Sequence, residues 1–385
     1  MKGSIRQRGE NSWELRVFIG RDPVSGRVRY ATKSVRGGKR EAQRALAAMV
    51  SAAPASAPIS SMTVADTLER WFDHARDGLS PSTVANTRMI IDKHLGPHIG
   101  AVPLSKLTPE RIDAAYRALR DHGGRGGKSL APATVHRAHN VLHRAVGQAV
   151  RWGWLPTNPV SLASPPRRPA PDIRPPAPAE VMQLFAEAAK EGPAFALYVL
   201  VAAVTGARRG ELIALRWSDV DFDAGVVQLR RGIVHGITGL AEKDTKTHTA
   251  RRIAVDAATI EALRQHRSAA EDVATACGAV VTGECFVFSY APDGRQNWSP
   301  ALVTQAFARV AKRAGVPEVR LHDLRHFVAT RLLSNGVDVR TVAGRLGHRN
   351  PNVTLNVYAH FLPEADRDAA DLLGRLLAKP TGNVT

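Results

Sequence analysis

Apolar and polar positions alternate near the start of the chain and predict a small β-sheet. In residues 13–19, apolar side chains occupy every second position, the period of a strand with one buried face. Turn-forming residues follow at 22–26, and residues 27–32 alternate again. A basic, alanine-rich stretch from Lys39 predicts a helix. We therefore expect residues 1–50 to form a three-stranded sheet backed by one helix.

The pattern changes to a helical period in residues 62–163. Thr63 and Ser80 each precede apolar residues at helical spacing, and both residue types commonly stand at a helix start. The clearest helix is expected from Pro132 to Trp152, because its apolar residues recur every three or four positions along one stripe. The stripe consists of Val135, Ala138, Leu142, Ala145, Val146 and Ala149.

The last part of the chain, residues 175–385, mixes helix and strand patterns. Runs at 225–230 and 251–255 predict two strands with a loop between them. We expect a mainly helical domain with a small antiparallel sheet. Its helices are predicted at 181–190, at 194–203 and at several places from 299 onward.

Two linkers separate these parts. Residues 51–61 are rich in Ala, Pro and Ser and carry no charge, and residues 164–180 contain repeated prolines that remove helix hydrogen bonds. The sequence thus predicts a multidomain α+β chain with three domains, at 1–50, 62–163 and 175–385.

The charge balance indicates a polyanionic partner. The 385 residues include 53 Lys and Arg against 35 Asp and Glu, a net charge of +18, and the sequence pI is about 10.7. Residues 1–50 alone contain 12 basic and four acidic residues. A nucleic acid would bind such a chain through its phosphates. Composition alone leaves open an incidentally basic protein, or an arginine content that reflects codon usage.

Cysteine usage and hydropathy predict a cytoplasmic protein without membrane contact. Cys277 and Cys285 lack metal-ligand spacing, so we expect no disulfide framework, and a reducing compartment fits. The first residues contain no apolar signal segment, and no apolar stretch reaches the roughly 18 residues needed to cross a bilayer.

Two histidine pairs with four-residue spacing raise the question of a metal. His139 and His143 have no acidic or cysteine ligand beside them, so a polar helix face is the better interpretation. His322 and His326 have the spacing of a zinc-binding pair, but a metalloprotease needs Glu where Asp323 lies. We therefore expect no metal.

Four segments carry the candidate chemistry. They are TGARRGELIALRWSDVD (205–221), KTHTARR (246–252), LHDLRHFVATRLL (321–333) and LGHRNPNVTLNVYAH (346–360). Together and in this order, they closely resemble the signature of the tyrosine recombinase, or phage integrase, family. The resemblance covers nearly the whole chain and is strongest from Thr205 to His360.

The resemblance implies six catalytic residues. Glu211 falls where the family has an acidic residue that supports the site, and Ala207 is smaller than the Leu or Met common there, which should matter only for packing. Lys243 is an alternative for the catalytic lysine, but the residues after Lys246 fit the family run better. The six residues are Arg208, Lys246, His322, Arg325, His348 and the nucleophile Tyr358.

These residue types suit the cleavage of a phosphodiester without a metal or nucleotide cofactor. Attack by a side-chain oxygen passes through a phosphorane-like state, whose extra negative charge Arg208 and Arg325 can clamp with forked hydrogen bonds. Tyr358 would form a covalent intermediate that conserves the energy for religation. The two histidines can donate hydrogen bonds or move protons near neutral pH, and the lysine is the candidate acid for the departing 5′ oxygen.

By the same resemblance, we expect a site-specific recombinase of a phage or integrative element. Residues 1–50 would bind arm-type sites, and residues 62–163 would form, with the catalytic domain, a clamp around double-stranded DNA at the core site. Family members act as tetramers on two DNA sites, and an accessory DNA-bending or directionality factor is compatible with this. The segment 363–377 has apolar residues at helical spacing and would pack on a neighbouring protomer or on its own domain.

Three other functions stay open from sequence alone. A chromosome-dimer resolvase shares the chemistry but generally lacks an arm-binding domain. A DNA-binding regulator would have kept the fold and lost catalysis, which the complete set of six residues argues against. A metallohydrolase would lose cleavage in EDTA.

Overall fold

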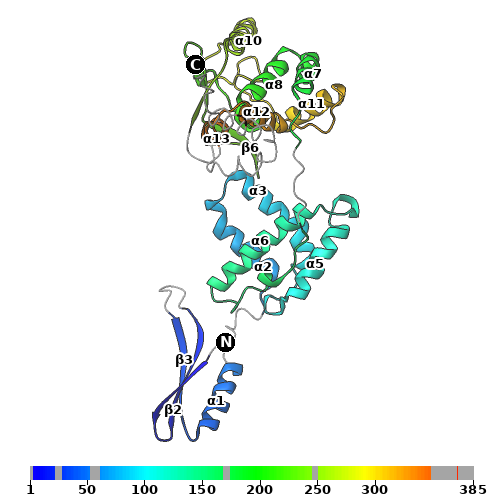
Figure 1. The fold of residues 1–385 in the computed structure, drawn as a ribbon. Coiled ribbons are helices and arrows are strands. Elements are labelled where there is room, and N and C mark those ends of the chain that lie inside the picture. The colour runs from blue at the N-terminus through cyan, green and yellow to red at the C-terminus, as the bar shows by residue number, and fades with distance from the viewer. Residues whose placement is uncertain are drawn as a thin grey trace, which may run out of the picture. The chain divides into compact units, whose positions relative to one another are not determined.

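The structure, a computed structural model, contains two compact units, Met1–Ala170 and Pro171–Thr385 (Figure 1). Each unit has its own cluster of buried apolar residues. Within the described part of the chain, no helix is long and apolar enough to span a membrane. The residues that the structure describes are 3–21, 28–52, 61–167, 174–244, 250–347 and 371.

Residues 3–52 form an antiparallel sheet backed by one helix, which confirms the predicted fold. The strand order is β1-β2-β3. Leu15 and Val17 of the central strand are fully buried, as is Ala42 of the helix, whereas Arg16 between them is exposed. The elements are β1 (Gly3–Gly9), β2 (Ser12–Arg21), β3 (Val28–Arg36) and α1 (Lys39–Ala52).

Residues 61–163 are helical, and their first helix begins where the sequence predicts. The Thr63 hydroxyl accepts a hydrogen bond from the Asp66 amide at 3.2 Å, and the Asp66 carboxylate accepts one from the Thr63 amide at 2.8 Å. Ser80 likewise precedes α3, and the predicted apolar stripe of α6 is fully buried. The helices are α2 (Val64–Ala75), α3 (Pro81–Ile90), α4 (Gly96–Ile99), α5 (Pro109–His122) and α6 (Pro132–Arg151), with a π-helical stretch at Ile91–Leu95.

The histidines of α6 contact protein groups. His139 Nδ1 lies 2.9 Å from the Tyr116 hydroxyl, and His143 Nε2 lies 3.1 Å from the Ser161 hydroxyl. Burial lowers the pKa of His139, and the positive charge that neighbouring histidines can carry adds to this. His139 is therefore uncharged at neutral pH, and these contacts fit the interpretation as a polar helix face.

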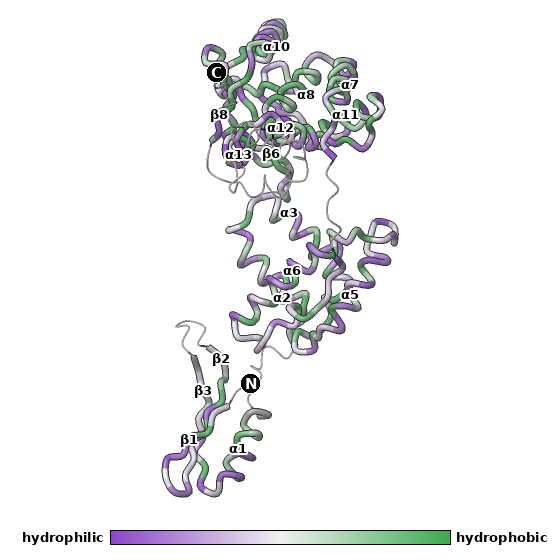
Figure 2. The backbone as a smooth tube through the Cα atoms, in the orientation of Figure 1, coloured by the Kyte–Doolittle hydropathy of each residue, from purple (hydrophilic) through white to green (hydrophobic). Residues whose placement is uncertain are grey.

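Residues 174–347 form a mainly helical domain with small antiparallel sheets, as predicted. Helix α8 consists almost entirely of apolar residues (Figure 2). Its Tyr198 and Val201 are fully buried. In the sheet of order β4-β5-β8, Val227 pairs with Ile253, and both are buried. The elements are α7 (Pro178–Ala188), α8 (Pro193–Thr205), α9 (Arg209–Ile213), β4 (Val220–Asp221), β5 (Val226–Leu229), β8 (Arg251–Ala254), α10 (Ala257–Ala276), α11 (Pro300–Arg313), α12 (Asp323–Ser334) and α13 (Val339–Leu346).

A second sheet corrects the prediction for the residues between β5 and β8. The sequence predicts a loop there, but β6 (Arg231–Gly236) and β7 (Gly239–Asp244) form a two-stranded antiparallel hairpin. The loop prediction is wrong. The sequence did not indicate these strands because three glycines interrupt the alternation of apolar residues that marks a strand. Backbone pairing, which does not depend on that alternation, nevertheless runs the full length of both strands.

Candidate active site

A sharp turn between two helices fixes the backbone of Arg208. Helix α8 ends at Thr205, and Gly206 follows with a φ of +63°, a left-handed conformation that strains other residues. A Cβ atom at Gly206 would also lie 2.6 Å from a methyl carbon of Leu346. Arg208 then precedes α9, and its amide donates a hydrogen bond to Glu211 Oε2 at 2.7 Å. The turn therefore holds Arg208 against the carboxylate of Glu211.

Glu211 binds two arginines. The Arg208 guanidinium donates to Oε1 at 2.9 Å, while Arg251 of β8 donates to Oε1 at 3.0 Å and to Oε2 at 2.6 Å. The side chains of Glu211 and Arg251 are only 7% and 9% exposed. Burial alone would raise the pKa of Glu211, but the hydrogen bonds and charges of the two arginines outweigh it and hold this pKa below its ordinary value. The carboxylate therefore stays ionised and orients Arg208.

Arg325 is the second predicted arginine, and it is buried near the start of α12. Its guanidinium donates to the carbonyl oxygens of Gly206 at 2.8 Å and Leu346 at 2.6 Å. These contacts join Arg325 both to the turn before Arg208 and to the end of α13. A guanidinium held by two carbonyls keeps a fixed plane, as a forked contact with a phosphate requires.

Three arginines converge on the end of α13. They donate hydrogen bonds to the carbonyls of three consecutive residues. Arg251 donates to residue 345 at 3.0 Å, Arg325 to residue 346 at 2.6 Å and Arg208 to residue 347 at 3.4 Å. The last carbonyls of a helix lack partners within the helix and favour a positive charge. The next residue in the sequence is the predicted site residue His348.

Gly347 permits this close approach. It ends α13 with a φ of +70°, again in the left-handed region. A Cβ atom there would lie 2.8 Å from Nη1 and 3.2 Å from Cδ of Arg251. Any side chain at this position would therefore press on Arg251 and disturb its contact with Glu211.

His322 lies at the surface immediately before α12. Its ring meets that of His326 edge-on, with centroids 5.1 Å apart. The surrounding protein atoms, together with His326 and Arg325, lower the pKa of His322 to about 4. His322 is therefore neutral at pH 7 in the free protein and can accept a proton. Asp323, by contrast, is buried and accepts three hydrogen bonds from Arg320.

Three of the six predicted site residues, Lys246, His348 and Tyr358, lie outside the described residues. The other three lie near one another, because Arg325 binds the Gly206 carbonyl in the turn before Arg208, and His322 directly precedes the helix that contains Arg325. The alternative lysine, Lys243, lies in β7.

Arg251 is the site residue whose role the sequence does not reveal. In β8, Arg251 and Ile253 are buried, whereas Arg252 and Ala254 are exposed. A charged residue on the same face of a strand as a buried isoleucine indicates a buried charge, which needs a partner of opposite charge. That signal was present in the sequence, but the partner, Glu211, belongs to a distant segment that only the fold brings close.

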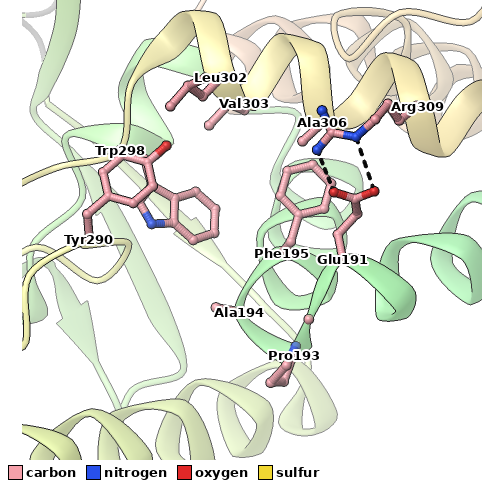
Figure 3. A pocket seen from close by; sticks show the side chains of 11 residues that line it. Glu191, Pro193, Ala194, Phe195, Tyr290, Trp298, Leu302, Val303, Ala306 and Arg309 are labelled. Carbon is pink, nitrogen blue, oxygen red and sulfur yellow. Dashed lines mark hydrogen bonds and ion pairs between the residues drawn. The ribbon is translucent and has the colours of Figure 1, made fainter.

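A cavity of about 340 Å³ in the same domain shares no residue with the arginine cluster (Figure 3). Phe195, Trp298 and Leu302 are among its lining residues, and Glu191 and Arg309 pair with each other beside them at 2.6 Å. The lining is mainly apolar, with Tyr290 and the Glu191–Arg309 ion pair as its polar groups, and it includes none of the six predicted site residues. The described residues also include no group of three or more His, Cys, Asp or Glu that could hold a metal ion.

Comparison with known families gives two matches. Residues 177–364 match the sequence profile of the Phage integrase family. Residues 63–119 match the profile of the N-terminal SAM-like domain of phage integrases. The first range contains all six predicted site residues.

Known integrases are similar over most of the chain. The ICEBs1 integrase of Bacillus subtilis is 23% identical over 381 residues, which cover 97% of this chain and 100% of that protein. A putative prophage phiRv2 integrase of Mycobacterium tuberculosis is 28% identical over 313 residues, which cover 80% of this chain and 77% of that protein.

Solved structures show the same fold. The Tn1549 transposon integrase in complex with transposon right end DNA has a TM-score of 0.67 and 19% identity, and the match covers 81% of this chain and 100% of that chain. A lambda integrase tetramer bound to a Holliday junction has a TM-score of 0.58 and 21% identity, covering 90% of this chain and 96% of that chain.

Proposed function

We propose that this chain, which belongs to the phage integrase family of tyrosine recombinases, cleaves DNA through a 3′-phosphotyrosyl bond to Tyr358. It is a site-specific integrase of a phage or integrative element. The observation that carries this proposal is the convergence of Arg208 and Arg325. Arg208 comes from the turn before α9 and Arg325 from α12, and they bind adjacent carbonyls directly before His348.

The scissile phosphate would bind at this pair of arginines. The Arg208 side chain is 44% exposed, so a DNA phosphate can reach it while Glu211 holds the guanidinium in place. Arg325 is fixed by its carbonyl contacts. Donors that are held in place before the reaction stabilise developing charge most effectively, and each typically contributes about 10²–10³ in rate.

In the cleavage step, the Tyr358 oxygen attacks phosphorus, and the bond from phosphorus to the 5′ oxygen breaks. The tyrosine proton passes to a base, a role that we assign to His322 because its ring is neutral at pH 7 in the free protein and so has an unprotonated nitrogen. Lys246 donates a proton to the departing 5′ oxygen, and His348 donates a hydrogen bond to a non-bridging oxygen. Attack by another 5′ hydroxyl then reverses these steps and joins the exchanged strand.

A nicked suicide substrate tests this reaction. Cleavage next to the nick releases a short fragment that diffuses away, so a covalent adduct accumulates. We expect an adduct from the wild-type protein, with or without EDTA, and none from Tyr358→Phe, which should bind DNA almost unchanged. An adduct from Tyr358→Phe would refute the assignment. Binding without any adduct would favour a regulator, and loss of cleavage in EDTA would favour a metallohydrolase.

A sulfur-substituted substrate separates the two candidate lysines. When sulfur replaces the bridging 5′ oxygen, the leaving group is a thiolate, which is stable without a proton because thiol pKa values lie near about 8.5. Lys246→Ala should cleave normal DNA slowly and the sulfur substrate at nearly the wild-type rate. If Lys243→Ala shows this behaviour instead, Lys243 is the general acid.

Residues 1–50 are proposed to bind arm-type DNA through the sheet face that α1 leaves open. On this face, Arg16 pairs in register with Ser4 and Thr32, and its guanidinium lies 5.1 Å from the ring centre of Tyr30. Such groups can contact bases and phosphates when a sheet enters the major groove. Deleting residues 1–50 should spare cleavage at core sites and impair integration that needs arm sites. Equal activity of both forms on a full attachment site would contradict this role.

Assembly and location complete the proposal. Residues 62–163 and the catalytic domain would form a clamp on the core site in the bacterial cytoplasm, with an accessory DNA-bending or directionality factor. Four copies would assemble on two sites, as supported by the tetramer of the similar lambda integrase. Sedimentation on a synthetic Holliday junction should show four chains per junction, and a stable complex with two chains would contradict the tetramer.

A further inference from the structure

The β6–β7 hairpin leads directly into the segment that contains the proposed general acid. Strand β7 ends at Asp244, and Lys246 follows two residues later in the sequence. The two strands form a sheet of their own, and no third strand pairs with them among the described residues. The position of the hairpin on the domain therefore depends on contacts other than β-pairing.

One of these contacts is with α9, the helix that follows Arg208. Ile233 of β6 is buried, and its carbonyl oxygen approaches Gly210 so closely that a Cβ atom there would lie 2.4 Å away. A Cβ atom at Gly232 would lie 3.9 Å from Cγ of Glu211. Strand β6 is therefore packed directly against the helix that carries the active-site carboxylate.

The turn after α9 binds both strands through ion pairs. Arg231, at the start of β6, donates to both oxygens of the buried Asp219 at 3.0 Å. Arg216 donates to Glu242 of β7 at 2.9 Å, and the Arg216 amide donates to Asp219 at 3.1 Å. Both anchoring residues, Arg216 and Asp219, thus belong to one short turn.

Arg216 is itself held by the body of the domain. Its guanidinium lies 5.2 Å from the ring centre of Phe286 and donates to Glu284 at 2.6 Å. Glu284 is 71% exposed, whereas Glu242 is 35% exposed, so water screens the pair with Glu242 less. Phe286 therefore connects Arg216, and through it β7, to the body of the domain, whereas the exposed Glu284 adds little to holding Arg216.

We propose that the ion pair between Arg216 and Glu242 positions the general acid. By fixing β7, it fixes the point from which the chain enters residues 245–249, and this would limit how far the Lys246 ammonium can lie from the departing 5′ oxygen. Proton transfer needs hydrogen-bond distance, so a shift of about 1 Å at the end of β7 is enough to slow it. Arg216 and Glu242 are positioning residues, and this inference rests on the proposed role of Lys246.

The test compares Glu242→Gln with the matched control Glu284→Gln. Each variant keeps the side-chain size and removes one carboxylate from Arg216. Glu242→Gln should form the adduct on normal nicked DNA about tenfold more slowly, yet cleave the 5′-sulfur substrate at the wild-type rate. Glu284→Gln should match wild type on both substrates. DNA affinity and Tm should be unchanged in both variants.

Each other outcome overturns the inference in a distinguishable way. Equal slowing of Glu242→Gln on both substrates would show that Glu242 acts on phosphate binding or folding rather than on proton transfer. Normal cleavage of both substrates, or equal slowing in Glu284→Gln, would show that the pair with Glu242 has no special role. Lys246→Ala is measured in parallel: if sulfur fails to restore it, the proposed lysine role is wrong, and the inference is wrong with it.

Discussion

Replacing Arg251 with methionine tests whether the buried Glu211 carboxylate governs Arg208. Methionine occupies a buried position well but removes both hydrogen bonds to Glu211 and the one to the Arg345 carbonyl. Glu211, whose side chain is 7% exposed, would keep only the more exposed Arg208 as an ionic partner. Breaking one side of a buried ion pair costs about 3–5 kcal/mol, because the remaining charge is left buried.

We expect the free energy of unfolding to fall by about 3 kcal/mol, since Arg208 still compensates part of the charge. For a unit of this size, that loss lowers Tm by roughly 6–12 °C. Burial would now raise the pKa of Glu211, and its protonation would release Arg208. Cleavage at pH 7 should fall about a hundredfold, the typical loss for one oriented donor, and should recover partly at higher pH as Glu211 ionises again.

Thermal unfolding and adduct formation between about pH 6 and 9 measure the two effects. The double variant Arg251→Met with Glu211→Gln is the control, because it removes the uncompensated charge. Its Tm should return toward the wild-type value, while its cleavage stays low because Arg208 still lacks a carboxylate. A double variant no more stable than Arg251→Met would refute the charge argument. Wild-type cleavage by Arg251→Met would refute the orienting role.

Gly347 and His322 give two smaller effects. Gly347→Ala places a methyl group on a residue in the left-handed region, 2.8 Å from Arg251 Nη1. Urea unfolding should therefore show that the free energy of unfolding falls by about 1–3 kcal/mol. The control is Gly344→Ala, whose Cβ would meet nothing within 4 Å and which should cause no such loss. The pKa of His322 is lowered from 6.5 to about 4, so as pH falls through this range the unfolded chain binds the proton first and stability decreases. His322→Asn should reduce that decrease, and an unchanged pH dependence of unfolding would contradict this assignment.

The sequence predicted an element correctly where all the residues that determine it lie in one short segment. The helix start at Thr63 depends on a partner three residues away, and the stripe of α6 needs only the helical period. The β6–β7 hairpin was missed because its stability comes from backbone pairing and from contacts with Gly210 and Asp219, which belong to a different segment of the sequence. No local pattern of apolar residues records such contacts.

The same distinction applies to the site. The resemblance of the motifs to the phage integrase signature indicated Arg208, His322 and Arg325 as candidates, and the chemistry of these residue types suits the reaction. Their geometry was not predictable, since it depends on three segments that meet at the carbonyls of residues 345–347. Arg251 illustrates the limit: its sequence shows a charge at a buried strand position, but only the fold identifies its partner.

If the scissile phosphate binds at this arginine cluster, as we propose, the charges of the cluster match the transition state better than the bound substrate. Arg208, Arg251 and Arg325 donate to the end of α13, and Glu211 is the carboxylate that pairs with two of them. These four groups carry a net charge of two positive units, whereas a phosphodiester carries one negative charge and the phosphorane-like state carries more. Under the proposed function, this positive surplus is best neutralised when phosphorus is attacked, so the binding energy would be realised where it accelerates the reaction.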